Sequence, residues 1–226
     1  VAEHALAMVM SLNRKIYKAF NRIREQNFSL SGLLGFDLYG KTVGVIGTGN
    51  IGEVFCRIML GLGCRVLAYD VHENDTLEKS GVHYLPFDEL LPECDIISLH
   101  CPLNNNTRYM INDKTIQQMK KGIMLINTSR GALIDTQAVI KALKSRHIGY
   151  LGIDVYEQEE NIFFENLSEE IIQDDVIARL ISFPNVLITS HQGFFTFEAL
   201  SQIAEVTLSN IKAFITEKKL VNEVTV

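Results

Sequence analysis

The chain has 226 residues, of which 47% are hydrophobic and 21% charged, and its formal net charge is -6. This balance is typical of a globular protein with a substantial core, and the lack of a basic face argues against nucleic acid as a partner. No apolar run reaches the roughly 18 residues of a membrane span, and no signal peptide is evident at the start. We therefore expect a cytoplasmic protein that does not contact a membrane.

The first predicted element is a long amphipathic helix over residues 1–25. Apolar residues such as Val9, Leu12 and Ile16 recur in it at helical spacing. Val1 already falls inside this pattern, and no residue before it caps the helix. We therefore expect that the chain is cut from a longer one.

Short apolar runs then alternate with helical patterns. The predicted strands are 42–46, 65–69, 95–99, 123–127, 149–153 and 186–189. The predicted helices lie near 50–62, 74–80, 86–92, 113–120, 135–145 and 170–182. Nearly continuous apolar strands that are separated by helices predict a parallel sheet covered on both faces, and hence a doubly wound α/β domain.

A trailing helix is predicted over residues 195–218, where Leu200, Ile203 and Leu208 recur at helical spacing. Long flanking helices on such a domain often lead to a second domain. We therefore predict a linking helix at 1–25, the α/β domain at 26–194, and a segment at 195–226 that returns to an N-terminal domain missing from this chain.

The four cysteines lie within or beside apolar runs and show no C-x-x-C spacing; they are Cys56, Cys64, Cys94 and Cys101. Reduced, mostly buried thiols in a cytoplasmic protein are the simplest interpretation. We expect no metal site.

A glycine-rich motif, G-x-G-x-x-G at Gly47, Gly49 and Gly52, follows the strand 42–46 and opens a helix. The pattern alone is weak, but Asp70 ends the next strand, and this full context is typical of a dinucleotide site. Gly47 permits a tight turn, Gly49 lets the backbone approach a pyrophosphate, and Gly52 allows close packing of helix and strand. The alternative is a glycine-rich turn without a ligand.

The chemistry around this motif favours NAD over NADP. The N–H groups near Asn50 and Ile51 lie at a helix N-terminus, where the dipole favours a phosphate. Asp70 would accept hydrogen bonds from the adenosine ribose and repel a 2′-phosphate. The next residues are Val71 and His72, neither of which is an arginine.

Four polar stretches follow predicted strands and so lie at the carboxyl edge of the sheet, where open α/β sheets bind ligands. They are SLHCPLNNNT (98–107), INTSRGALID (126–135), GIDVYEQEE (152–160) and SHQGF (190–194). Arg130, Glu159 and His191 are therefore expected to converge although they are far apart in the sequence. The alternatives are a surface arginine, a histidine that only packs at a strand end, and a solvated glutamate with Glu157 and Glu160 as rivals.

The motifs together resemble those of the D-isomer-specific 2-hydroxyacid dehydrogenases. G-x-G-x-x-G with Asp70, LHCP, NTSRG, DVYExE and the late histidine occur in that order, and the resemblance runs from VAEHALAM to the last helix. It implies an NAD-binding Rossmann domain and hydride transfer between nicotinamide and the 2-carbon of a small 2-keto or 2-hydroxy acid. It also implies a homodimer and a smaller N-terminal domain that closes over the substrate, so we expect this chain alone to bind NADH but to turn over poorly.

The resemblance also implies the catalytic roles. Arg130 would bind the substrate carboxylate and polarise its carbonyl, and a guanidinium can hold a carboxylate through two parallel hydrogen bonds. His191 would donate a proton to the ketone oxygen in reduction and act as the base in oxidation. Glu159 would fix the imidazole tautomer and favour the protonated ring.

The remaining cofactor contacts follow from the same resemblance. Cys101 and Pro102 would form the wall of the adenosine site, with Thr107 nearby. Thr128 and Ser129 would line the nicotinamide side.

Asp154 would accept a hydrogen bond from the carboxamide. His100 lies in the LHCP turn and is expected to be a wall of the site rather than a catalyst. The histidines without a motif are expected to be structural or at the surface; they are His4, His72, His83 and His147.

The long segment between Glu159 and His191 resembles the insertion of the fermentative D-lactate dehydrogenase subgroup. It therefore favours pyruvate and D-lactate as the substrate pair. Gly193, close to the catalytic histidine, departs from the small non-glycine residue expected there. One alternative is another D-2-hydroxyacid dehydrogenase, acting on a different 2-keto acid, hydroxypyruvate or phosphoglycerate. The other is a non-catalytic, corepressor-like protein that senses NAD.

Overall fold

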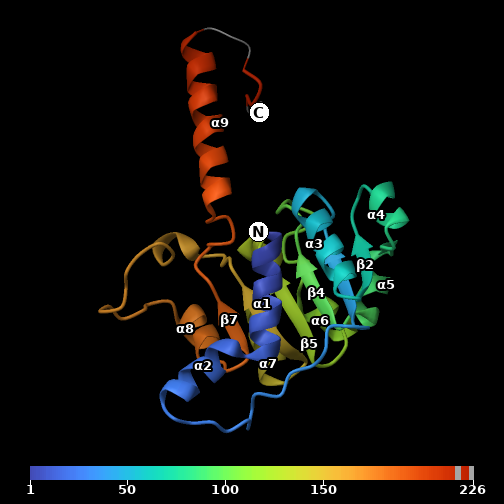
Figure 1. Ribbon diagram of the computed structural model, residues 1–226, viewed down its shortest axis with the longest axis vertical. Helices are drawn as coiled ribbons and strands as arrows, with labels where there is room; N and C mark the ends of the chain where they lie inside the picture. Colours follow the sequence, from blue (N-terminus) through green and yellow to red (C-terminus); the bar gives the residue numbers. More distant parts are fainter. Residues whose placement is uncertain (217–219, 224–226) are drawn as a thin grey trace. The chain divides into compact units, whose positions relative to one another are not determined.

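The computed structural model describes residues 1–216 and 220–223. The chain divides into two compact units, Val1–His191 and Gln192–Val226. The larger unit is a central sheet with helices on both faces (Figure 1). We describe each unit by itself.

The sheet of the larger unit has seven strands in the order β3-β2-β1-β4-β5-β6-β7, and every pair is parallel. The strands are β1 Thr42–Ile46, β2 Arg65–Tyr69, β3 His83–Tyr84, β4 Ile96–Leu99, β5 Ile123–Asn127, β6 Ile148–Ile153 and β7 Val186–Ile188. The chain order reverses between β1 and β4, which is the switch point of a Rossmann sheet. The predicted doubly wound α/β class is confirmed.

Short helices connect the strands. The α-helices are α1 Ala2–Arg14, α2 Ile16–Arg24, α3 Asn50–Gly61, α4 Asp75–Lys79, α5 Phe87–Leu90, α6 Asp113–Gln118, α7 Thr136–Lys144, α8 Asp175–Ile181 and α9 Phe197–Ile215. Three 3-10 turns complete the described elements: η1 Leu91–Glu93, η2 Gly131–Leu133 and η3 Glu159–Asn161.

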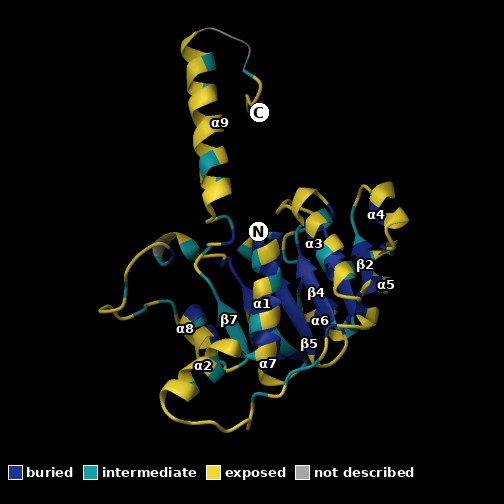
Figure 2. Cartoon of the chain, in the orientation of Figure 1, coloured by how far each residue is buried: buried dark blue, intermediate teal, exposed yellow. Residues whose placement is uncertain are grey.

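The two faces of the sheet carry separate apolar cores. One core packs α1 and α3 against the sheet through residues such as Met8, Leu12 and Phe55. The other lies under α6, α7 and α8. Because both faces are covered, the central strands β1, β4 and β5 are buried along their whole length (Figure 2). This rigid platform holds the loops at its carboxyl edge.

The leading segment differs from the single helix predicted over residues 1–25. Lys15 adopts a left-handed conformation, with φ of 51°, and separates α1 from α2. The break lets α1 stay on the sheet while α2 turns away, and α2 has no buried residue. The buried amide of Asn13 then fastens the following loop to α1, because it donates to the carbonyl of Phe36 at 2.7 Å and accepts from the Phe36 N–H at 2.8 Å.

Two further elements differ from their predicted bounds. The helix predicted over 170–182 begins only at Asp175, because the carboxylate of Asp174 caps it by accepting from the N–H groups of Val176 and Ile177. The two-residue strand β3 was not predicted. It pairs with β2 at the sheet edge and is too short to show an alternating pattern.

The smaller unit consists mainly of α9. Its side-chain cap is the hydroxyl of Thr196, which accepts from the N–H of Ala199 at 3.2 Å. The helix buries none of its residues within this chain, and Ile203, Leu208 and Phe214 are exposed. The predicted end of this helix, residue 218, lies outside the described residues. Among the helices of the described part, none has the length and apolarity to cross a membrane.

Candidate active site and dinucleotide site

The turn after β1 has the geometry that a dinucleotide-binding loop needs. Gly47 has φ of 92°, and a Cβ on it would meet the backbone N of Cys101 at 2.5 Å. A Cβ on Gly52 would fall on the carbonyl oxygen of Gly47. A Cβ on Gly49, in contrast, would meet nothing within 4 Å. The first and third glycines are therefore required by packing, whereas the space beside Gly49 is open for a ligand.

The start of α3 faces this open space. Gly49 is its N-cap, and no side chain caps the first N–H groups of the helix, those near Asn50 and Ile51. A helix N-terminus without a side-chain cap favours an anion such as a pyrophosphate.

Asp70 lies directly after β2, where its carboxylate is organised by backbone donors. Oδ2 accepts from the N–H and the hydroxyl of Thr48 at 2.5 and 3.1 Å, and Oδ1 accepts from the N–H of His72 at 3.1 Å. Partial burial raises the pKa of Asp70, but these hydrogen bonds outweigh it, so the net pKa lies below its usual value. Asp70 is therefore a fixed anion, and its two oxygens retain acceptor capacity for ribose hydroxyls.

The loop after β5 is ordered by Asn127, which the sequence reasoning did not single out. Its amide donates to the carbonyl of Arg130 at 2.9 Å and accepts from the N–H of Ser129 at 3.1 Å. The hydroxyl of Ser129 donates to the carbonyl of Cys101 at 2.6 Å and so joins the loops after β4 and β5. Thr128 is buried, and its hydroxyl has no hydrogen-bond partner among the described residues.

The guanidinium of Arg130 is exposed at the end of this loop. One of its amino groups donates to the carbonyl of Ser129 at 2.7 Å, which steadies the side chain. Arg130 forms no ion pair within the described part of the chain. Because a guanidinium has five N–H donors, it retains several for a carboxylate.

The loop after β4 contains the other predicted wall residues. Cys101 is buried, and burial raises the pKa of its thiol to about 11, which disfavours the reactive thiolate. The hydroxyl of Thr107 donates to the carbonyl of Pro102 at 2.7 Å and accepts from the N–H of Asn104 at 2.8 Å. All four cysteines are buried and free.

His191 and Glu159 meet across neighbouring strands. The Nδ1 atom of His191 lies 2.7 Å from Oε1 of Glu159, and Oε2 of Glu159 accepts from the N–H of Tyr156 at 2.8 Å. The N–H of His191 donates to the carbonyl of Asp154 at 2.7 Å, which fixes the backbone in a left-handed conformation with φ of 50°. The imidazole is thus oriented through both its ring and its backbone.

The contacts distinguish the three neighbouring glutamates. Glu157 accepts from the guanidinium of Arg108 at 2.9 Å and from the hydroxyl of Tyr109 at 2.6 Å. Glu160 is exposed. Of the three, Glu159 is the one whose carboxylate lies 2.7 Å from Nδ1 of His191, as the family spacing predicted.

Asp154 is buried beside this pair and has partners of its own. Its Oδ1 accepts from the hydroxyl of Thr189 at 2.5 Å and lies 3.3 Å from Nε2 of His4. His4 also lies 3.1 Å from the Thr189 hydroxyl. The structure brings His4 from α1 to the carboxyl edge of the sheet. The sequence did not predict its contact with Thr189 and Asp154, because these residues are distant in the sequence and no local pattern indicates that they meet.

His100 follows β4, and its surroundings favour the neutral imidazole. Its Nε2 lies within hydrogen-bond distance of the Ser98 hydroxyl, at 2.8 Å, and its ring packs on Phe55 with centroids 4.9 Å apart. Burial lowers the pKa of this imidazole to about 3. A protonated His100 is therefore disfavoured in the folded protein.

We expect His100 to make folding sensitive to acid. The unfolded state takes up this proton below about pH 6.5, whereas the folded state resists it down to about pH 3, so the stability contributed by neutral His100 is lost as pH falls through this window. Between pH 6 and 4, the free energy of unfolding should fall more steeply than in His100→Gln, by up to about 1.4 kcal/mol per pH unit. Urea titrations at several pH values measure this. The exposed His83→Gln is the control, and parallel curves for His100→Gln and the unmodified protein would contradict the expectation.

These features fit an NAD group, as the sequence predicted. The open space at Gly49, the helix start without a side-chain cap and the organised carboxylate of Asp70 match a pyrophosphate and a ribose. The buried, unpartnered hydroxyl of Thr128 is a further indication, because such a group costs about 1–3 kcal/mol unless a ligand or water satisfies it.

Comparison with known proteins agrees with this geometry. Residues 6–193 match the family model described as "D-isomer specific 2-hydroxyacid dehydrogenase, NAD binding domain". The chain belongs to this family. It is therefore an NAD-binding domain, and its Rossmann sheet and cofactor class are as predicted.

Individual relatives are similar over nearly the whole chain. The chain is 51% identical to 2-hydroxyacid dehydrogenase A of Aspergillus oryzae over 222 residues and 53% identical to D-lactate dehydrogenase of Escherichia coli over 211 residues. These matches cover 98% and 93% of this chain, but 64% of each relative. The chain thus spans less than two thirds of the length of these curated relatives.

A solved structure of the pyruvate reductase of Chlamydomonas reinhardtii is similar with a TM-score of 0.95 and 46% identity; the match covers 98% of this chain and 67% of that one. A D-lactate dehydrogenase from Aquifex aeolicus complexed with NAD and lactic acid is similar with a TM-score of 0.90 and 36% identity, over 99% of this chain and 70% of that one. The individual site residues of this chain stay predictions.

Proposed function

We propose that the complete protein is an NAD-dependent D-2-hydroxyacid dehydrogenase that interconverts pyruvate and D-lactate. The observation that carries this proposal is the 2.7 Å contact between His191 and Glu159 at the edge of the sheet where the dinucleotide loop lies. Two relatives named D-lactate dehydrogenase, which are 52% and 53% identical to this chain, support the choice of substrate pair.

The residues of this chain would divide the work as follows. Glu159 accepts from His191 Nδ1, so the second ring nitrogen, Nε2, is the one that gives the proton to the ketone oxygen in reduction and takes it back in oxidation. Arg130 binds the substrate carboxylate through its remaining N–H donors and polarises the carbonyl. Asp154 would accept a hydrogen bond from the carboxamide of the cofactor.

NAD, when bound, supplies the hydride acceptor or donor. The chain's part is to orient it: the Gly49 turn and α3 hold the pyrophosphate, and Asp70 holds the adenosine ribose. Thr128 and Ser129 would line the nicotinamide side of the cofactor site. The adenosine side would be lined by Cys101, Pro102 and Thr107, none of which supplies a catalytic group.

The division of the chain is also part of the proposal. We infer that 1–25 and 195–226 connect a cofactor domain at 26–194 to a substrate domain that lies outside this chain, because the relatives are longer than the matched region. A homodimer is proposed on the family resemblance and on the exposed apolar stripe of α2, formed by Ile16, Phe20 and Ile23. The four buried, free thiols support a reducing compartment such as the cytoplasm.

The complete protein should oxidise NADH when pyruvate is added, and the product should be D-lactate. Absorbance of NADH measures the rate, and an enzymatic assay specific for each lactate enantiomer measures chirality. L-lactate as product, or a higher kcat/KM for hydroxypyruvate than for pyruvate, would contradict the proposed substrate pair. NADH binding without turnover of any 2-keto acid would favour the NAD-sensing alternative instead.

A further inference from the structure

A basic cavity lies at the edge of the sheet opposite the candidate active site. It has a volume of about 640 Å³, and five cationic side chains line it: Lys15, Lys18, Lys144, Arg146 and Arg179. Its other walls include residues at the start of β6 and just before β7. Since β6 has six residues, the length of this strand, about 20 Å, separates the cavity from the loops that hold Asp154 and Glu159.

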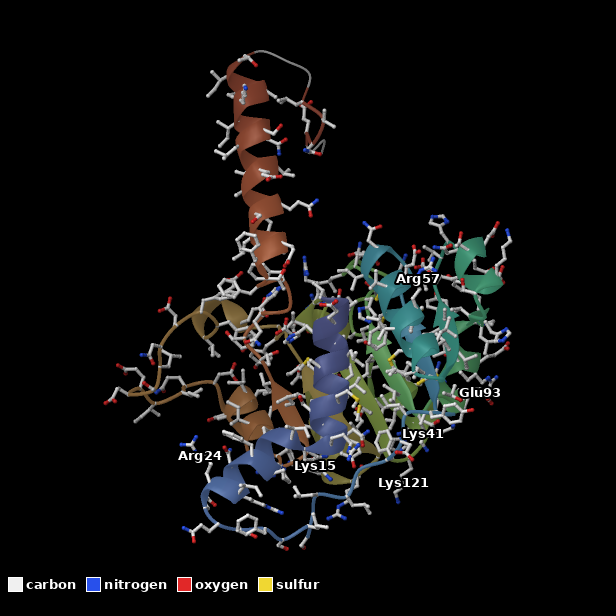
Figure 3. The ribbon with its side chains drawn as sticks, in the orientation of Figure 1. Lys15, Arg24, Lys41, Arg57, Glu93 and Lys121 are labelled. Atoms are coloured by element: carbon white, nitrogen blue, oxygen red, sulfur yellow. The ribbon has the colours of Figure 1, made fainter. Side chains whose placement is uncertain are left out.

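The five cations come from three separate parts of the fold. Lys15 lies at the junction of α1 and α2 (Figure 3), and Lys18 lies one turn later. Lys144 is the last residue of α7, and Arg146 lies two residues beyond it. Arg179 lies in the last turn of α8 with its guanidinium 4.8 Å from the ring centroid of Phe183. Tertiary folding, and not one basic run of sequence, brings them together.

The backbone holds two of the lysines toward this region. The ammonium of Lys15 donates to the carbonyl of Leu34 at 2.6 Å, and that of Lys18 donates to the carbonyl of Pro184 at 2.5 Å. Both side chains are half-buried, so ordering them costs less entropy when a ligand binds. An ammonium has three donors, and one carbonyl leaves two for a ligand.

The positive charge of the cavity is not neutralised by the protein. None of the five side chains forms an ion pair in the described residues, and no carboxylate lines the cavity. This concentration occurs in a chain that has 27 acidic and only 21 basic residues. Burial, followed by the charges of Lys15 and Arg22, lowers the pKa of Lys18.

A second cavity shows the more usual arrangement. It is lined by Lys41, Lys120 and Lys121, but it also contains Asp95, whose Oδ1 accepts from the ammonium of Lys120 at 3.1 Å. Its volume is about 210 Å³. The comparison shows that basic residues in this fold can be balanced by an acid, and that those of the larger cavity are not.

Helix dipoles explain only part of the cluster. Cations near the C-termini of α7 and α8 are favourable there, which accounts for Lys144 and Arg179. Lys18, however, lies in the first turn of α2, where the dipole is also positive and no acidic residue is present. Lys15 is at once the C-cap of α1 and the N-cap of α2, so the two dipoles oppose each other there. The dipoles therefore do not account for the two lysines of this junction.

We propose that this cavity binds a small polyanion, a molecule that carries phosphate groups or several carboxylates. Its volume is within the range of about 300–1,000 Å³ that is typical of small-molecule sites. Phosphates and carboxylates accept the charge-assisted hydrogen bonds that lysine and arginine donate. This site is separate from the dinucleotide loop, and the proposal does not depend on the reaction that the complete protein catalyses.

The test is calorimetric titration of the complete protein with inorganic pyrophosphate and, separately, with citrate. Saturating NADH is present so that the dinucleotide loop is already filled, and sodium chloride at matched ionic strength controls for screening. We expect saturable binding of at least one of the two anions, and the stronger one identifies phosphate or carboxylate as the preferred chemistry. No saturable heat with either anion would overturn the proposal.

Two matched double variants localise the binding. Lys144→Ala with Arg146→Ala removes two exposed charges from the basic cavity, and we expect at least about a tenfold loss of affinity, equivalent to 1.4 kcal/mol. Lys120→Ala with Lys121→Ala removes the same charge from the second cavity and should change the affinity less than about twofold. Circular dichroism checks that both variants fold.

Equal losses in the two double variants would mean that the anion responds only to net charge, and the proposal would be wrong. It would also be wrong if the first variant left the anion affinity unchanged. If that variant in addition altered the sedimentation coefficient, the basic residues would contact another protein chain rather than a small anion.

Discussion

Replacing His191 by asparagine should lower kcat for pyruvate reduction in the complete protein by at least about 100-fold, the usual contribution of a general acid. Asparagine suits the test because His191 has φ of 50°, a left-handed conformation that asparagine tolerates better than most residues. The backbone hydrogen bond to Asp154 can therefore persist while the imidazole is lost. Steady-state assays give kcat, and fluorescence titration gives the Kd of NADH, which should change little.

The matched control is His83→Asn, an exposed histidine on the edge strand β3, which should leave kcat unchanged. Glu159→Gln examines the same pair from the other side. Glu159 accepts from both His191 and Tyr156, whereas an amide has only one acceptor oxygen, so one of these two donors must face an NH₂ group. A kcat within a factor of about three for His191→Asn would remove His191 from the role of proton donor.

The sheet could be predicted from the sequence because its strands are buried on both faces. A strand such as β5, IMLIN, is apolar at nearly every position, and this signal does not depend on tertiary contacts. The strand β3 pairs over two residues only, so it leaves no pattern to detect. The glycine motif was likewise visible as a local pattern, and the need for Gly52 arises within one strand–turn–helix unit, because its Cβ would meet the carbonyl of Gly47. The close approach at Gly47, in contrast, is to Cys101 in the loop after β4.

The features that were missed depend on contacts between distant residues. Lys15 ends α1 in a left-handed conformation with neither glycine nor proline to indicate it, so the apolar periodicity of residues 1–25 continued through the break. His4 meets Thr189, a residue 185 positions away, and nothing near His4 announces this contact. The basic cavity is of the same kind, because its cations come from α2, α7 and α8.

The candidate site lies between these cases. Family spacing predicted that Glu159, rather than Glu157 or Glu160, faces His191, and the observed contact agrees with it. Spacing could not reveal why, because the choice depends on Glu157 being engaged by Arg108 and Tyr109 from the loop after β4. Family spacing thus named a candidate pair, and tertiary contacts bring its two side chains together; their catalytic roles stay predictions.

Gly49→Ala should weaken NADH binding while the fold keeps its stability. The backbone of Gly49, with φ of -64° and ψ of -167°, suits any residue, and an added Cβ meets nothing within 4 Å in the protein. The same Cβ would occupy the space into which the pyrophosphate must approach. We expect the Kd of NADH to rise at least about tenfold, or 1.4 kcal/mol, with a change in the free energy of unfolding below about 1 kcal/mol.

Two other glycines of the same helix make this prediction specific. Gly61, in the last turn of α3, also has nothing within 4 Å of an added Cβ, so Gly61→Ala should leave the Kd of NADH unchanged. Because alanine favours a helix more than glycine does, this variant should raise the free energy of unfolding by at most about 1 kcal/mol. Gly52→Ala drives its Cβ onto the carbonyl of Gly47 and should lower the free energy of unfolding as well as the affinity. If Gly49→Ala binds NADH as tightly as Gly61→Ala does, the pyrophosphate does not pass close to Gly49, and the open space at the start of α3 has no part in holding the cofactor.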